Sequence, residues 1–161
     1  NFFPGFIHRP SVYLEGLSEA VKQYGILSKH VVLDFTRSET QRDMGHLKSV
    51  CEYCRSKGYS IALDDIESLE GARKLVPEIR PDFVKIDMHL ARQAGDPAKQ
   101  SVIRQIVELV HAAGGTVIGE GIETEETYSQ LSQLNVDLYQ GYLFSPPVPV
   151  ETVLKKSAKA G

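Results

Sequence analysis

Short apolar runs rich in β-branched residues alternate along the chain with longer amphipathic stretches. This alternation is typical of βα units built around a parallel sheet. The apolar runs predict strands at residues 30–35, 60–64, 83–87, 116–120 and 137–140. The amphipathic stretches predict helices at residues 11–24, 41–57, 69–76, 99–113, 123–134 and 149–159. We therefore predict an α/β fold with a parallel sheet.

Glycine and proline mark the ends of the predicted helices. Gly25 and Gly58 each follow an amphipathic stretch, at the position where a helix favours a left-handed glycine. Gly114 is followed by a second glycine and is expected to stop the helix predicted at residues 99–113. The third helix is expected to end at residue 76, with Pro77 and Pro81 in the connection to the next strand.

Each predicted strand ends on a group that can bind a metal ion or move a proton. In chain order these groups are Asp34, Asp64 with Asp65, Lys85, Glu120 and Gln140. In βα architectures, ligands and catalytic groups collect at the edge where the carboxyl ends of the parallel strands meet. Aspartate is also a favoured helix cap, so any one acid could have a purely structural role. Five such strand ends in series favour one shared cavity.

The pair Asp64 and Asp65 is the sharpest of these signals. Neighbouring carboxylates repel each other and raise each other's pKa unless cations or hydrogen-bond donors compensate. Carboxylate and amide oxygens are suitable ligands for magnesium or manganese. Lys85 could orient or deprotonate a metal-bound water. The pattern is compatible with a two-metal site that acts on a phosphoester.

Length and charge narrow the class of protein. The chain has 161 residues, 42% of them hydrophobic, which suits one domain spanning residues 1–161 and is too short for two. Lys and Arg number 18 against 21 Asp and Glu, and no basic window could follow a nucleic-acid backbone, so DNA is not an expected partner. With no apolar run of about 20 residues, we expect a soluble, cytoplasmic protein without a membrane span. The start at Asn1 rather than Met suggests a fragment of a larger protein.

The two cysteines form an isolated C-x-x-C motif at Cys51 and Cys54. Such a motif can support redox chemistry or half of a zinc site. Leu47, Val50, Cys51 and Cys54 also follow the i, i+3, i+4, i+7 spacing of one helix face. This spacing favours core packing. The five histidines are scattered, with no second ligand at helical spacing, and receive no metal assignment.

Five short segments resemble a known family in their order and spacing. They are Leu-Asp-Phe-Thr-Arg-Ser at 33–38, Leu-Asp-Asp at 63–65, Val-Lys-Ile-Asp at 84–87, Gly-Glu-Gly-Ile-Glu-Thr at 119–124 and Gln-Gly-Tyr-Leu-Phe at 140–144. Together they resemble the EAL domain, the family of phosphodiesterases that linearise cyclic di-GMP. The resemblance extends along nearly the whole chain.

The resemblance implies a TIM-barrel-like (β/α) fold, incomplete at the N-terminus, with one strand antiparallel to the rest. It implies a two-metal Mg²⁺ or Mn²⁺ site and in-line attack of an activated water on one phosphodiester of cyclic di-GMP. Carried over by position, the metal ligands are Asn1, Asp34, Asp64, Asp65 and Glu120. The catalytic residues are Lys85, Asp65 and Gln140, and Glu123 is the residue expected to contact a guanine.

Several departures from the family pattern leave the function open. The Glu-Ala-Leu motif is absent, Asp34 replaces a glutamate, Arg37 replaces an acid, and the loop at 66–72 lacks the family's glycines. One hypothesis is a cyclic di-GMP phosphodiesterase domain whose own activity is in doubt. The other is a degenerate domain that acts in signalling as a cyclic di-GMP receptor or a protein-interaction module. Bared sheet edges also predict self-association or attached regulatory domains.

Overall fold

The computed structural model describes residues 10–36 and 44–152, in which strands and helices alternate. The strands are β1 (Val32–Phe35), β2 (Ser60–Ile66), β3 (Phe83–Ile86), β4 (Thr116–Gly119) and β5 (Leu138–Tyr139). The helices are α1 (Pro10–Gln23), η2 (Ser28–His30), α3 (Met44–Ser56), α4 (Leu69–Ile79), α5 (Met88–Ala91), α6 (Pro97–Ala112) and α7 (Glu125–Ser132). The predictions for Asn1 and Arg37, and most of the helix predicted at 149–159, lie outside the described residues.

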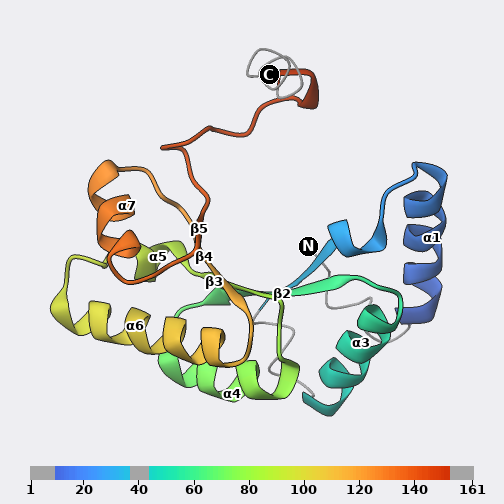
Figure 1. Cartoon of the computed structure of the whole chain (residues 1–161), viewed down its shortest axis with the longest axis horizontal. Coiled ribbons are helices and arrows are strands. Elements are labelled where there is room, and N and C mark those ends of the chain that lie inside the picture. Colours follow the sequence, from blue (N-terminus) through green and yellow to red (C-terminus); the bar gives the residue numbers. More distant parts are fainter. Residues whose placement is uncertain (1–9, 37–43, 153–161) are drawn as a thin grey trace.

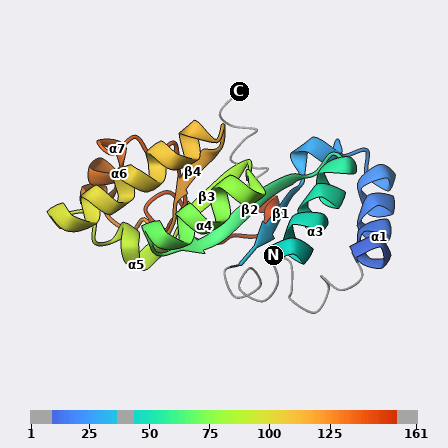
Figure 2. The ribbon, with the colours of Figure 1, turned by 90° about the horizontal axis from the view of Figure 1, so that it is seen from below.

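The five strands form one parallel sheet in the order β1-β2-β3-β4-β5, which confirms the predicted fold class. A sequential order of parallel strands is the arrangement found in the wall of a βα barrel. In this part of the chain every strand pair is parallel, so the antiparallel strand implied by the resemblance is not among them. Helices α4 and α6 lie side by side along the sheet, while α3 and α1 lie at its β1 end (Figure 1; Figure 2).

Burial alternates along β1, β3 and β4 and decides which of their side chains reach the site. Leu33 and Phe35 in β1, and Val84 and Ile86 in β3, are buried at alternate positions. Side chains of a strand point alternately to its two faces, so residues 34 and 85 point away from these core positions. The helices supply the other half of the core, because α3 and α4 contact β2 and α6 contacts β4. No described helix combines the length and apolar character needed to span a membrane.

Helix α4 shows where sequence reasoning was wrong. Its end was expected at residue 76, but the helix continues through Pro77 to Ile79. Proline lacks an N–H and so removes the helical hydrogen bond to the carbonyl four residues before it, and the last turn of α4 forms without that bond. Arg80 ends the helix in the left-handed conformation, with φ of 48°, and its N–H donates to the Val76 carbonyl. The guanidinium of Arg55 also donates to the Ile79 and Arg80 carbonyls, both at 2.7 Å.

The cysteine pair lies in the core, as its spacing predicted. Cys51 and Cys54 are both free thiols in α3, with side chains at most 1% exposed. Burial raises the pKa of Cys51 to about 12 and the pKa of Cys54 to about 11. Because the thiolate is the reactive form of cysteine, these pKa values argue against redox or metal chemistry at the motif.

The buried thiols make a direct test of this packing. At pH 8 we expect neither Cys51 nor Cys54 to react appreciably with DTNB in the native protein, because both are buried and protonated. In 6 M guanidinium chloride, about the concentration that unfolds even very stable domains, both should react. Absorbance at the wavelength of the released thiolate measures the reaction. A fast native reaction of one equivalent would contradict the packing.

Gly141 lies where two backbone segments cross beside β5. A Cβ atom at this position would overlap the backbone nitrogen and carbonyl group of Ile122. We expect Gly141→Ala to lower the free energy of unfolding by about 2 kcal/mol or more, because backbone must move to admit the methyl group. Gly16 in α1 serves as the control, because a methyl group added there would meet no atom within 4 Å. Gly16→Ala should raise stability by roughly 0.5 to 1 kcal/mol in the same urea titration.

Candidate functional site

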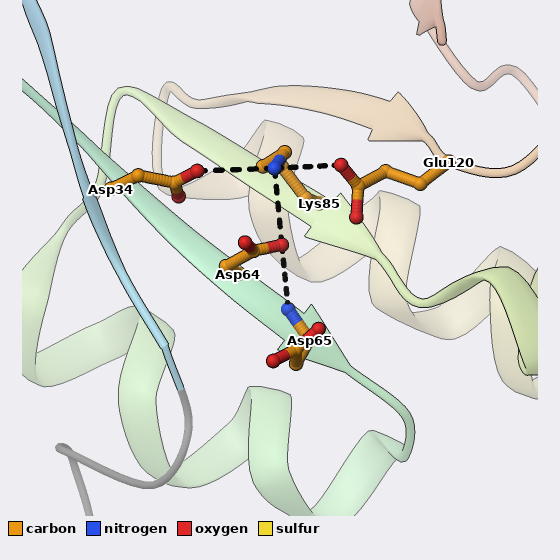
Figure 3. Close-up of polar contacts among 5 residues, drawn as sticks. All are labelled: Asp34, Asp64, Asp65, Lys85 and Glu120. Atoms are coloured by element: carbon orange, nitrogen blue, oxygen red, sulfur yellow. Dashed lines mark hydrogen bonds and ion pairs between the residues drawn. The ribbon is translucent and has the colours of Figure 1, made fainter. Parts of the chain in front are cut away.

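A cluster of charged side chains occupies the carboxyl edge of the sheet (Figure 3). Lys85 from β3 lies at its centre, and its Nζ is 3.1 Å from Asp34 Oδ2 of β1 and 3.2 Å from Asp64 Oδ1 of β2. The same Nζ is 2.6 Å from Glu120 Oε1, on the residue that follows β4. These four side chains are only 10 to 18% exposed. The structure therefore brings together four of the predicted strand-end residues.

The local fold of β2 adds a fifth residue to the cluster. The pairing of β2 with β3 shifts between Leu63 and Ile66, and Asp65 takes the left-handed conformation with φ of 57°. This turn lets the Asp65 N–H donate to Asp64 Oδ1 at 2.9 Å. Aspartate tolerates this conformation better than most residues. The irregular strand end thus presents two consecutive carboxylates at the same edge.

Three carboxylates are close enough together to share a cation. One oxygen from each of Asp64, Asp65 and Glu120 can be chosen so that all lie within 4.8 Å of one another. Asp34 is not in this group, and its Oδ2 contacts Lys85. The other oxygen, Asp34 Oδ1, is buried and has no hydrogen-bond partner within the described ranges. Oxygen donors in this arrangement fit a hard divalent cation such as Mg²⁺ or Mn²⁺.

Burial dominates the electrostatics of the cluster. It raises the pKa of Asp34 and of Glu120, even though Lys85 acts in the opposite direction on both. Burial, with the charges of Asp64 and Asp87 adding to it, also raises the pKa of Asp65. For Lys85, burial lowers the pKa, but the hydrogen bonds and charges of Glu120 and Asp34 outweigh it and leave the pKa above its usual value. Lys85 is therefore a fixed positive charge at neutral pH.

Two predicted site residues lie outside this cluster. Gln140 follows β5, where its N–H donates to the Gly119 carbonyl at 2.9 Å, but its side chain is exposed. Glu123 lies in the loop after β4 and is ion-paired with Arg92 Nη2 at 2.5 Å. Sequence reasoning missed Arg92, because nothing in the local pattern marks the end of the one-turn helix α5 as part of the site.

The EAL domain family model matches residues 6–147. This chain belongs to the EAL domain family. It is 32% identical over 139 residues to a Pseudomonas aeruginosa protein named Cyclic di-GMP phosphodiesterase PA2567, and the match covers 86% of this chain and 24% of that protein. The chain thus covers about a quarter of the length of such curated relatives.

Solved structures match the EAL chain over nearly its whole length. The manganese and cyclic di-GMP complex of Klebsiella pneumoniae BlrP1 superposes with a TM-score of 0.82 at 27% identity, covering 91% of this chain and 38% of that one. The EAL domain of Mycobacterium smegmatis DcpA gives a TM-score of 0.82 at 23% identity, covering 92% and 67%, and supports the fold alone. The expected TIM-barrel-like α/β fold is confirmed, and within the described ranges the five strands form an open sheet.

The Arg92–Glu123 pair of the EAL chain should contribute little to its stability. Both side chains are about half exposed, at 41% and 55%, so water screens the pair. We expect Glu123→Ala to lower the free energy of unfolding by less than about 1 kcal/mol, as measured by urea titration.

Asp137 provides the matched comparison. Its Oδ2 accepts the Val117 N–H at 2.7 Å and also contacts His111 Nε2 at 2.8 Å. We expect Asp137→Ala to lower the free energy of unfolding by about 1 to 3 kcal/mol, because it removes a partner of a partly buried N–H. An equal loss in the two variants would show that Glu123 is a structural residue.

Proposed function

We propose that this EAL chain binds cyclic di-GMP at the strand-end cluster and belongs to a phosphodiesterase that converts it to the linear dinucleotide. The observation that carries the proposal is the close group of Asp64, Asp65 and Glu120 beside Lys85. The relative PA2567 is named a cyclic di-GMP phosphodiesterase, and BlrP1 was solved with manganese and cyclic di-GMP. Both names support the same ligand for this chain.

The donor set supports a pair of Mg²⁺ or Mn²⁺ ions as the cofactor. Asp64, Asp65 and Glu120 would hold one cation, and Asn1 and Asp34 are the further ligands that the family resemblance suggests. The buried, unpartnered Asp34 Oδ1 is a polar atom that a cation or a water could satisfy. Bound divalent cations would polarise the phosphate and lower the pKa of a water.

The chain's own residues then have distinct roles in the proposed reaction. Lys85 stays protonated, which favours donating a hydrogen bond to the attacking water or to a phosphate oxygen over removing a proton. Asp65 and Gln140 would help to orient the water, and Gln140 has an exposed side chain available for this. Glu123 would accept hydrogen bonds from a guanine, with its carboxylate held by Arg92.

One observation favours a second function, a receptor that binds cyclic di-GMP without cutting it. Asp34 contacts the Lys85 ammonium and lies outside the group of three carboxylates. If Asp34 does not reach a second cation, the chain would keep one cation and the nucleotide but lose the activated water. The receptor could then signal to a protein partner.

Partners and location extend the proposal. The chain spans 24% of PA2567, which supports attached regulatory domains in the whole protein. The outer strands β1 and β5 expose Val32 at 44% and Leu138 at 47%, which supports self-association through the sheet edges. We place the protein in the cytoplasm, as a signalling protein acting on a soluble nucleotide.

The proposal is tested by titrating cyclic di-GMP into the 161-residue chain with and without Mn²⁺, followed by chromatography for the linear dinucleotide. We expect binding that depends on Mn²⁺ and is lost in Asp64→Asn, which removes a charged member of the carboxylate group. Glu108→Gln, an exposed acid on α6, is the matched control and should bind as the unmodified chain does. Linear product identifies the phosphodiesterase, and binding without product identifies the receptor. Unchanged binding in Asp64→Asn would contradict the site.

As the pH is lowered, metal binding at this site should weaken at a higher pH than metal binding at exposed carboxylates. Burial raises the pKa of Asp65 and of Glu120, and a protonated carboxyl group is a poor cation ligand. Each pKa is raised from its ordinary value, so protons compete with the metal ion at a higher pH than they do at an exposed carboxylate. We expect calorimetric Mn²⁺ affinity to fall as the pH is lowered from neutral, and the fall to begin at a higher pH than for carboxylates of ordinary pKa. A flat affinity as the pH is lowered would count against these two ligands.

A further inference from the structure

Each of the three N–H donors of the Lys85 ammonium group has an acidic partner. An ammonium group has three N–H donors, and its Nζ has one carboxylate within 3.2 Å for each of them. Lys85 therefore satisfies Asp34, Asp64 and Glu120 at once. Without this positive charge, three poorly hydrated carboxylates would face one another across the cluster and repel.

Two of these partners also belong to the group that could hold a divalent cation. Asp64 and Glu120 contact the ammonium, and both are within 4.8 Å of Asp65 in the three-carboxylate group. An ammonium and a divalent cation on the same carboxylates repel each other strongly in a site that is less than one-fifth exposed. The lysine and the metal ion are thus competitors for the same oxygens.

Asp34 lies on the other side of the ammonium from Glu120, as Figure 3 shows. It contacts Lys85 at 3.1 Å but is outside the three-carboxylate group. Its second oxygen, Oδ1, is buried without a partner in the described part of the chain. Asp34 can therefore accept a further hydrogen bond from Lys85 once the other two carboxylates bind a metal ion.

We propose that Lys85 is a built-in counter-cation that holds the metal ligands together in the metal-free site and yields Asp64 and Glu120 to an incoming divalent cation. Asp34 then retains the displaced ammonium while this first cation binds, and so acts on its binding through Lys85 rather than as one of its ligands. For the first cation, Asp34 is thus a positioning residue. The inference rests on the cation site of the proposed function but not on its nucleotide ligand.

The first test measures Mn²⁺ affinity by calorimetry on the metal-stripped 161-residue chain and on Lys85→Met. Removing the competing charge should tighten Mn²⁺ binding about tenfold or more. Lys48→Met is the matched control, because Lys48 pairs with Glu78 at 3.4 Å on the surface and both side chains are about half exposed. Its Mn²⁺ affinity should stay within about twofold of the unmodified chain. Equal or weaker binding by Lys85→Met would overturn the proposal.

A double-mutant cycle tests the role of Asp34. Asp34→Asn should weaken Mn²⁺ binding severalfold when Lys85 is present, because the displaced ammonium loses its acceptor. In the Lys85→Met background the same substitution should have no further effect, since there is no ammonium to retain. An equal loss in both backgrounds would show that Asp34 is a direct ligand of the first cation and would refute its proposed role.

Folding of the metal-free variant gives a second readout. If Lys85→Met loses its structure without metal, circular dichroism should show that Mn²⁺ restores it, since a divalent cation replaces the missing charge. Failure to fold at saturating Mn²⁺ would mean that Lys85 has a structural role that a cation cannot replace, and would overturn the proposal.

The outcomes separate this inference from the proposed function. Tighter Mn²⁺ binding by Lys85→Met, without any cyclic di-GMP binding by the unmodified chain, would support the counter-cation and contradict the proposed ligand. Equal Mn²⁺ affinities of Lys85→Met and the unmodified chain, with cyclic di-GMP binding by the unmodified chain, would contradict the counter-cation and support the proposed ligand. Absence of Mn²⁺ binding by both the unmodified chain and Lys85→Met would overturn both.

Discussion

The parallel register of five strands is the constraint on which the site depends. Because neighbouring strands run in the same direction, their carboxyl ends meet at one edge and bring Asp34, Asp64 and Lys85 together from separate parts of the sequence. The opposite edge fixes this register with two aspartates. Asp82, just before β3, accepts the Ile61 N–H at 2.7 Å, and Asp137, just before β5, accepts the Val117 N–H at the same distance. Asp82 and Asp137 thus fix the strand register at the amino edge of the sheet, and Asp34 and Asp64 at the carboxyl edge are available for chemistry.

Close backbone packing completes the carboxyl edge. The loop after β4 passes between α5 and the end of β5, and the Ile122 N–H donates to the Gln140 carbonyl at 3.1 Å. Gly141 permits this crossing, and Gly121, with φ of 65°, lies where a Cβ would overlap Met88 of α5. Glu120 precedes this crossing directly. Its position beside Lys85 therefore depends on backbone contacts rather than on the strand alone.

The sequence predicted the strands well and the partners of individual side chains poorly. Apolar runs with β-branched residues placed all five strands, because burial imposes the pattern that the prediction uses. The extension of α4 past Pro77 was missed because proline was taken to end the helix, whereas Arg55 of another helix stabilises the last turn of α4 by donating to its carbonyls. The left-handed Asp65 accompanies a shift in the pairing of β2 with β3, and the Arg92–Glu123 pair joins residues 31 positions apart, so neither has a local signal. Family resemblance named Glu123 but could not supply its partner.

The charge of the cluster argues for more than one cation in the proposed reaction. Four ionised carboxylates and one ammonium carry a net charge of −3, from Asp34, Asp64, Asp65 and Glu120 against Lys85. One divalent cation would leave the site negative and repel a phosphodiester, whereas two would make it positive and attract one. Burial is the main cause of the raised pKa values of three of the acids, and the charge of Asp64 adds to it. One divalent cation is enough for the carboxylates to bind metal, whereas attraction of an anionic nucleotide needs a second cation.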